Sequence, residues 1–139
     1  MIDPATLIPH RPPFLLVSGI ETLSPGSAAT GYLDVDPELD ILKGHFPGNP
    51  ILPGVYLLEA IAQLGAATVL ADERYKGTLP LFGGVDRARF RHQVRPGDRV
   101  DLEISMATLS ARAGKGSGRA AVSGKVAAEV DLFFVIAKG

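Results

Sequence analysis

Apolar residues occupy nearly every position between residues 55 and 71, and small residues recur among them. A helix that is apolar on almost all sides is surrounded by protein. The stretch lies at the short end of the roughly 17–25 residues that span a bilayer, and it contains Glu59 and Gln63, which are costly to place in lipid. The pattern therefore predicts a buried helix of a water-soluble protein rather than a membrane span.

The rest of the apolar pattern predicts strands. Residues 100–109 alternate, with Val100, Leu102, Ile104 and Met106 on one face. Further strands are expected at residues 28–35, 81–90, 119–122 and 126–136, with a bend near Gly83-Gly84 and a tight hairpin at Ser123-Gly124. Residues 111–118 carry three glycines and are expected to form a flexible hairpin tip instead of a strand.

One buried helix with five or six antiparallel strands is an α+β arrangement, in which a sheet wraps around the helix. The 139 residues fit one domain, so we expect residues 1–139 to fold as a single unit. A hydrophobic content of 46% is normal for a globular protein and argues against disorder.

Charge and cysteine content narrow the function classes. Lys and Arg number 14 and Asp and Glu 15, and this balance argues against a nucleic-acid or anionic-membrane binder. The absence of cysteine excludes disulfides, thiolate catalysis and Cys-ligated zinc. The first residues have neither the basic nor the apolar region of a signal peptide, so we expect a cytoplasmic protein.

Glu59 and His45 are the strongest candidates for chemistry. Glu59 is the only charged residue between positions 55 and 71, and a lone buried carboxylate costs several kcal/mol unless it is paired or protonated. A structural ion pair would explain Glu59 equally well. His45 lies in a loop rich in Gly and Pro directly before the helix, and an imidazole suits proton transfer at neutral pH. Most loop histidines only pack or bond to a carbonyl, which is also our interpretation of His10 and His92.

Gly54 is expected at the start of the helix, where the first amides have no partner within the helix. Such an amide can polarise a carbonyl oxygen, and a residue without a side chain allows close approach. A glycine needed only for the turn after Pro53 is the competing interpretation. Together, a His, a carboxyl and a free amide suit the removal of water from a 3-hydroxyacyl thioester, with no metal and no cofactor.

Four segments carry a family resemblance over residues 9–136. PHRPPFLLV at residues 9–17, GHFPGNPILPGV at 44–55, LEAIAQ at 58–63 and GVDRARFRHQVRPGD at 84–98 resemble the 3-hydroxyacyl-[acyl carrier protein] dehydratases of bacterial type II fatty acid synthesis. The resemblance implies a hot-dog fold, a long central helix wrapped by an antiparallel sheet. It also implies a homodimer or a trimer of dimers that acts on substrates carried by acyl carrier protein.

The resemblance assigns the family's catalytic His to His45, its catalytic Glu to Glu59 and its carbonyl-binding amide to Gly54. In such dimers the His and the Glu of one site come from different subunits. Related dehydratase/isomerases carry Asp where this chain has Glu59, which favours the plain dehydratase. The acyl tunnel is expected to be lined by Phe46, Val55 and Leu81, although some relatives carry an aromatic residue where Leu81 stands.

A carrier protein is acidic, so a basic rim is expected around the site, with candidates Arg87, Arg89, Arg91, Arg95 and Arg99. A solvated sheet face would explain the same arginines. Two other functions remain open at this point, a hot-dog thioesterase and a non-catalytic acyl-binding subunit. Release of free thiol would identify the thioesterase, and an unaltered His45→Ala variant would indicate the non-catalytic subunit.

Overall fold

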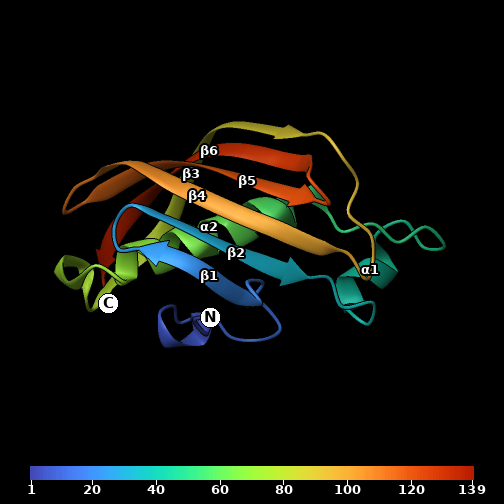
Figure 1. Cartoon of the computed structure of the whole chain (residues 1–139), viewed down its shortest axis with the longest axis horizontal. Helices are drawn as coiled ribbons and strands as arrows, with labels where there is room; N and C mark the ends of the chain where they lie inside the picture. Colours follow the sequence, from blue (N-terminus) through green and yellow to red (C-terminus); the bar gives the residue numbers. More distant parts are fainter.

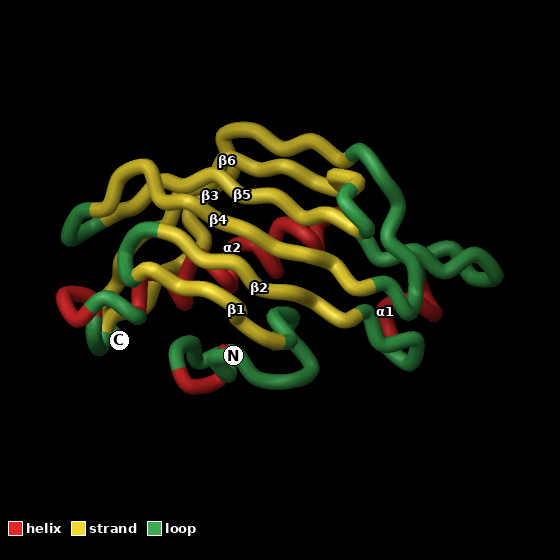
Figure 2. The backbone as a smooth tube through the Cα atoms, viewed as in Figure 1, coloured by secondary structure: helices red, strands yellow, loops and turns green.

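A six-stranded antiparallel sheet arches over one long helix in the computed structural model, which describes residues 1–139 (Figures 1 and 2). The strand order is β1-β2-β4-β5-β6-β3, so β1 and β3 are the two edges. The elements are η1 (Pro4–Thr6), β1 (Gly19–Ser24), β2 (Ala28–Asp34), α1 (Asp40–Gly44), α2 (Gly54–Leu70), η2 (Glu73–Tyr75), β3 (Thr78–Phe90), β4 (Arg99–Leu109), β5 (Ala113–Val122) and β6 (Lys125–Lys138). The predicted α+β arrangement is confirmed.

The core lies between α2 and the inner face of the sheet. Ile61 and Leu64 of α2 are fully buried, as is Phe134 of β6. Gly65 lets this face approach closely, because a Cβ there would lie 2.8 Å from the ring of Phe134. The alternation expected for β4 is found, with Val100, Leu102 and Ile104 buried against the helix.

The prediction of a flexible hairpin tip at residues 111–118 is wrong, because most of this segment belongs to β5. Gly114, Gly116 and Gly118 alternate with exposed residues and point inward. A Cβ on Gly118 would overlap the Cγ2 methyl of Ile61, and one on Gly116 would lie 2.9 Å from the sulfur of Met106. The glycines are therefore there because the helix and β4 lie close to this strand.

Two other sequence-based predictions, the hairpin at Ser123-Gly124 and the bend near Gly83-Gly84, agree better with the structure. Ser123 and Gly124 have φ of 50° and 79° and connect β5 to β6, which confirms the predicted hairpin. The pairing of β3 with β6 shifts register between Phe82 and Gly84, where a bend was expected. Edge strand β1 and the short helix α1 were not predicted, because neither has a marked apolar period.

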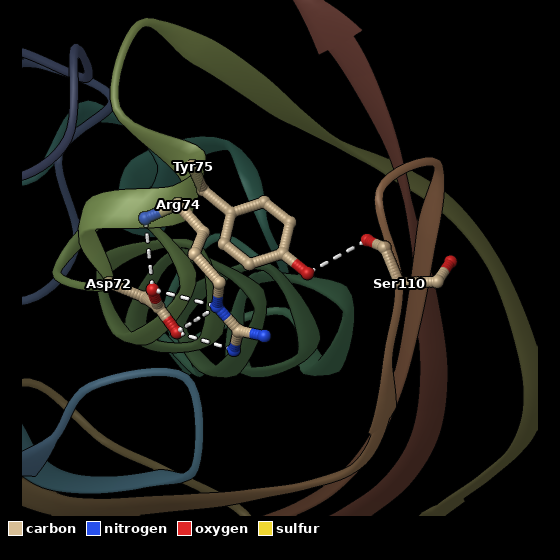
Figure 3. A network of polar contacts seen from close by, with 4 residues as sticks. All are labelled: Asp72, Arg74, Tyr75 and Ser110. Atoms are coloured by element: carbon tan, nitrogen blue, oxygen red, sulfur yellow. Dashed lines mark hydrogen bonds and ion pairs between the residues drawn. The ribbon is translucent and has the colours of Figure 1, made fainter.

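The segment after α2 is fixed by a small polar cluster (Figure 3). The Tyr75 hydroxyl donates to the Ser110 carbonyl over 2.9 Å, which ties η2 to the β4–β5 turn. Asp72 caps η2 and pairs with Arg74 at 2.7 Å. The side-chain hydrogen bond from Arg74 lowers the pKa of the Asp72 carboxyl. None of the helices has the length and apolar character needed to cross a membrane.

Candidate active site

His45 follows α1 and stands at the mouth of the loop that leads to α2. Its Nδ1 lies 2.7 Å from the carbonyl oxygen of Ile51. A carbonyl only accepts, so in the neutral ring Nδ1 carries the proton and Nε2 is left as the free base. The ring packs on Phe46, with centroids 4.2 Å apart. Phe46 has φ of 52°, a left-handed conformation that non-glycine residues seldom adopt outside constrained sites.

Gly54 is the first residue of α2, and its N–H donates no hydrogen bond within the chain. Such an amide, at the positive end of a 17-residue helix, is available to a carbonyl oxygen. The glycine itself has a packing reason, because a Cβ on residue 54 would lie 2.7 Å from Cε1 of Phe90. Packing against Phe90 therefore requires the glycine, while its position at the helix start leaves the amide free.

Glu59 lies one turn further along α2 and is held by Gln63. The Gln63 Nε2 donates to Oε2 of Glu59 over 2.8 Å and to the carbonyl of Phe14 over 2.8 Å. Its Oε1 accepts from the Leu16 amide over 2.8 Å. The fully buried Gln63 thus fixes both the Glu59 carboxyl and the loop beside it. The expectation that Glu59 is buried is wrong, since its side chain is 22% exposed to a cavity.

His10 stands beside Glu59, which the sequence analysis did not anticipate. Its Nε2 lies 3.9 Å from Oε2 of Glu59. His10 was interpreted as a packing residue because it follows a proline near the start of the chain. The available signal was its place in the segment PHRPPFLLV, which carries the family resemblance, just as Gln63 ends the segment LEAIAQ.

Within one chain, His45 and Glu59 line separate cavities. The cavity at His45, about 460 Å³, is also lined by Phe46, Gly54, Val55 and Phe90. The cavity at Glu59, about 220 Å³, is lined by His10, Gln63 and residues 79–82 of β3, which include Leu81. The structure therefore brings His45 together with Gly54, Phe46 and Val55, and places Glu59 with Leu81 elsewhere.

Strand β3 links the two cavities, because its first residues line the Glu59 cavity and its last residue, Phe90, lines the His45 cavity. It is an edge strand with an unpaired backbone row along one side. Large apolar side chains are exposed along it, namely Leu79, Leu81, Phe82, Val85 and Phe90. An apolar, unprotected sheet edge is typical of an interface.

The arginines expected to form a basic rim are partly neutralised. Arg91 pairs with Glu129 at 3.1 Å, and Arg99 pairs with Glu21 at 3.5 Å. Arg87 and Arg89 line an open hollow of about 400 Å³ that also contains Glu103, Glu129, Asp131 and Arg119. Their role in docking a carrier protein stays a prediction. No group of three or more His, Cys, Asp or Glu side chains is placed to hold a metal ion.

Known proteins resemble this chain over most of its length. A family model described as a FabA-like domain matches residues 8–131. The 3-hydroxyacyl-[acyl-carrier-protein] dehydratase FabZ of Clostridium botulinum (strain Okra / Type B1) is 47% identical over 132 residues, covering 95% of this chain and 92% of that protein. The dehydratase of the same name from Halalkalibacterium halodurans is 46% identical over 134 residues, covering 96% of each chain.

Among solved structures, the dehydratase heterocomplex ApeI:P from Xenorhabdus doucetiae superposes with a TM-score of 0.77 at 16% identity. The alignment covers 100% of this chain and 92% of that one. At this identity the likeness concerns the fold alone, and it confirms the predicted hot-dog fold.

Proposed function

The chain belongs to the FabA-like family and is a 3-hydroxyacyl-[acyl-carrier-protein] dehydratase of fatty acid biosynthesis, and we propose that His45 and Glu59 are its catalytic pair. The single observation that carries this proposal is the arrangement of a free imidazole Nε2, a helix-terminal amide and a carboxyl around the two ends of β3. No observation favours the thioesterase or the non-catalytic acyl-binding subunit.

The reaction removes one proton and one hydroxyl from neighbouring carbons. Nε2 of His45 takes the proton from the carbon next to the thioester carbonyl, and the electron pair of that C–H bond forms the new double bond. The Gly54 amide donates to the carbonyl oxygen, where negative charge gathers. Glu59 gives its proton to the departing hydroxyl, which leaves as water. Return of the proton from His45 to Glu59 resets the site.

This chemistry requires a second subunit, because one chain holds His45 and Glu59 in separate cavities. A two-fold axis that pairs β3 with a second β3 makes the two strands antiparallel. The first residues of one strand, beside Glu59, then lie next to Phe90 of its partner, beside the partner's His45. The proposed homodimer therefore has two complete sites, and each combines the His45 cavity of one chain with the Glu59 cavity of the other. The exposed apolar side chains of β3 support this pairing, which also places Phe46 and Val55 of one chain beside Leu81 of the other as a tunnel for the acyl chain.

Mixing two inactive variants tests the proposal. His45→Ala and Glu59→Gln should each lower kcat at least about 100-fold. After joint unfolding and refolding, about half of the dimers are mixed, and one of the two sites in each mixed dimer is intact. We therefore expect about 25% of wild-type activity. The readout is the absorbance of the conjugated enoyl thioester product. Each variant refolded alone is the control.

Recovery near zero despite demonstrated mixed dimers would show that both residues of a site come from one chain. Full activity of either variant alone would exclude that residue from catalysis. A trimer of dimers, docking of the acyl carrier protein on the basic rim and a cytoplasmic location stay predictions, which sedimentation, crosslinking to the carrier protein and cell fractionation respectively check.

A further inference from the structure

We infer that His10 is a positioning residue for Glu59, with its Nε2–H stabilising the carboxylate that forms when Glu59 gives up its proton. The inference rests on the proposed role of Glu59. The nitrogen and the carboxylate oxygen are 3.9 Å apart, beyond a hydrogen bond, with neither group fully buried. Both side chains line the same cavity, so a small movement of either one brings them into contact.

The position of His10 is fixed by contacts from Arg11 and Phe14. The Arg11 guanidinium donates to the carbonyl of His10 over 2.7 Å and to the carbonyl of Ile8 over 2.8 Å. The ring of His10 stacks on Phe14, with 6.4 Å between centroids and 22° between planes. The carbonyl of Phe14 is in turn bound by Gln63, the residue that holds Glu59. One network therefore sets the spacing between His10 and Glu59.

The other ring nitrogen of His10 decides which atom carries the proton. Nδ1 is buried and has no hydrogen-bond partner in the chain. A proton there would be a buried donor without an acceptor, which is more costly than an unused lone pair of a ring nitrogen. The neutral ring therefore carries its proton on Nε2, the nitrogen that faces Glu59.

The spacing fits a contact that strengthens during the reaction. While Glu59 is protonated, its carboxyl gains little from a donor at 3.9 Å. As the proton passes to the leaving hydroxyl, the carboxyl becomes an anion and attracts the N–H. Catalytic hydrogen bonds are often long in empty sites and shorten in the transition state. An interaction that is stronger in the transition state raises kcat and leaves KM unchanged.

Two amide variants test the inference, because they place an N–H at different depths. The amide nitrogen of His10→Gln reaches the position of Nε2, whereas that of His10→Asn reaches only the position of Nδ1. We expect His10→Gln to keep kcat within about 3-fold of wild type and His10→Asn to lose about 10-fold, both with KM within about 2-fold. The assay is the hydration and dehydration of a 3-hydroxyacyl thioester by the dimeric enzyme.

Phe14→Leu removes the ring that stacks on His10 and keeps the backbone carbonyl bound by Gln63, so it tests whether this stack fixes the imidazole beside Glu59. Its kcat should fall by less than that of His10→Asn, with KM within about 2-fold of wild type, because the N–H is displaced but still present. Equal losses in the two amide variants or a loss confined to KM would overturn the inference. Glu59→Gln tests the proposed function separately from the role of His10, because full activity of this variant would contradict the catalytic role of Glu59.

Discussion

Substitution of Gly118 by alanine tests whether β5 is rich in glycine because α2 lies against it. The new Cβ would overlap Cγ2 of Ile61 and lie 2.7 Å from the Glu103 carbonyl oxygen. Overpacking of this kind lowers the free energy of unfolding by about 1–3 kcal/mol. Replacing glycine also makes the unfolded chain less flexible, which offsets about 0.5–1 kcal/mol of this loss. A net loss of about 1–2 kcal/mol corresponds to a melting temperature lower by about 3–7 °C for a chain of this size.

A second substitution identifies the overlapping atom. Ile61→Leu removes the Cγ2 methyl, whereas Ile61→Val removes Cδ1 and keeps Cγ2. Combined with Gly118→Ala, Ile61→Leu should recover about 1 kcal/mol, and the recovery stays partial because the Glu103 carbonyl remains. The Ile61→Val combination should be additive to within about 0.5 kcal/mol.

The assay is thermal and urea unfolding at one fixed protein concentration, because the stability of the proposed dimer would depend on concentration. A Gly118→Ala variant as stable as wild type, or more stable, would refute the packing explanation of the glycines. Equal recovery by Ile61→Leu and Ile61→Val would show that Cγ2 is not the atom in the way.

Gln63→Leu leaves the Leu16 amide and the Phe14 carbonyl unpaired, so the free energy of unfolding measured in urea should fall by about 2–4 kcal/mol. We also expect a lower kcat. Unchanged stability would contradict the role of this side chain. Val85→Lys places a charge on the exposed apolar edge of β3 and should weaken the proposed dimer by about 100-fold or more. Sedimentation is the measurement, and an intact dimer at nanomolar concentration would be the contrary result. Arg74 lowers the pKa of Asp72, so the stabilisation from this pair is present above the unfolded-state pKa of Asp72 and is lost as the pH falls through the lower folded-state value. The melting temperature of Asp72→Asn should therefore lose this pH dependence below about pH 4. Melting temperatures that change with pH in parallel for variant and wild type would count against the prediction.

The sequence predicted the parts of the fold whose pattern is strong and local. Helix α2 begins at Gly54, only one residue before the expected start. The prediction was close because a continuous apolar run leaves little choice of structure. The first part of strand β5 was missed because glycine has low strand propensity, and the reason for Gly118 lies in Ile61, far away in the chain. A local pattern carries no information about such a contact.

The same distinction applies to the candidate site. His45 stands out in the loop rich in Gly and Pro before the predicted helix, Gly54 at the start of the helix and Glu59 within it. His10 does not, because its position beside Glu59 depends on how Gln63 and Arg11 hold a proline-rich loop. The separation of His45 from Glu59 depends on which end of β3 borders each cavity, and only the assembled sheet defines that.

The separation of His45 and Glu59 into two cavities of one chain has a consequence for inheritance. In the proposed dimer, each chain contributes its imidazole to one site and its carboxyl to the other. A chain without His45 therefore disables a single site, whichever partner it meets, and its own Glu59 still serves the partner's imidazole. In a cell that makes both normal and His45-deficient chains, activity should fall in proportion to the missing imidazoles. A single substitution of this kind should be recessive, whereas a chain without both His45 and Glu59 would disable both sites of a mixed dimer and should be dominant-negative.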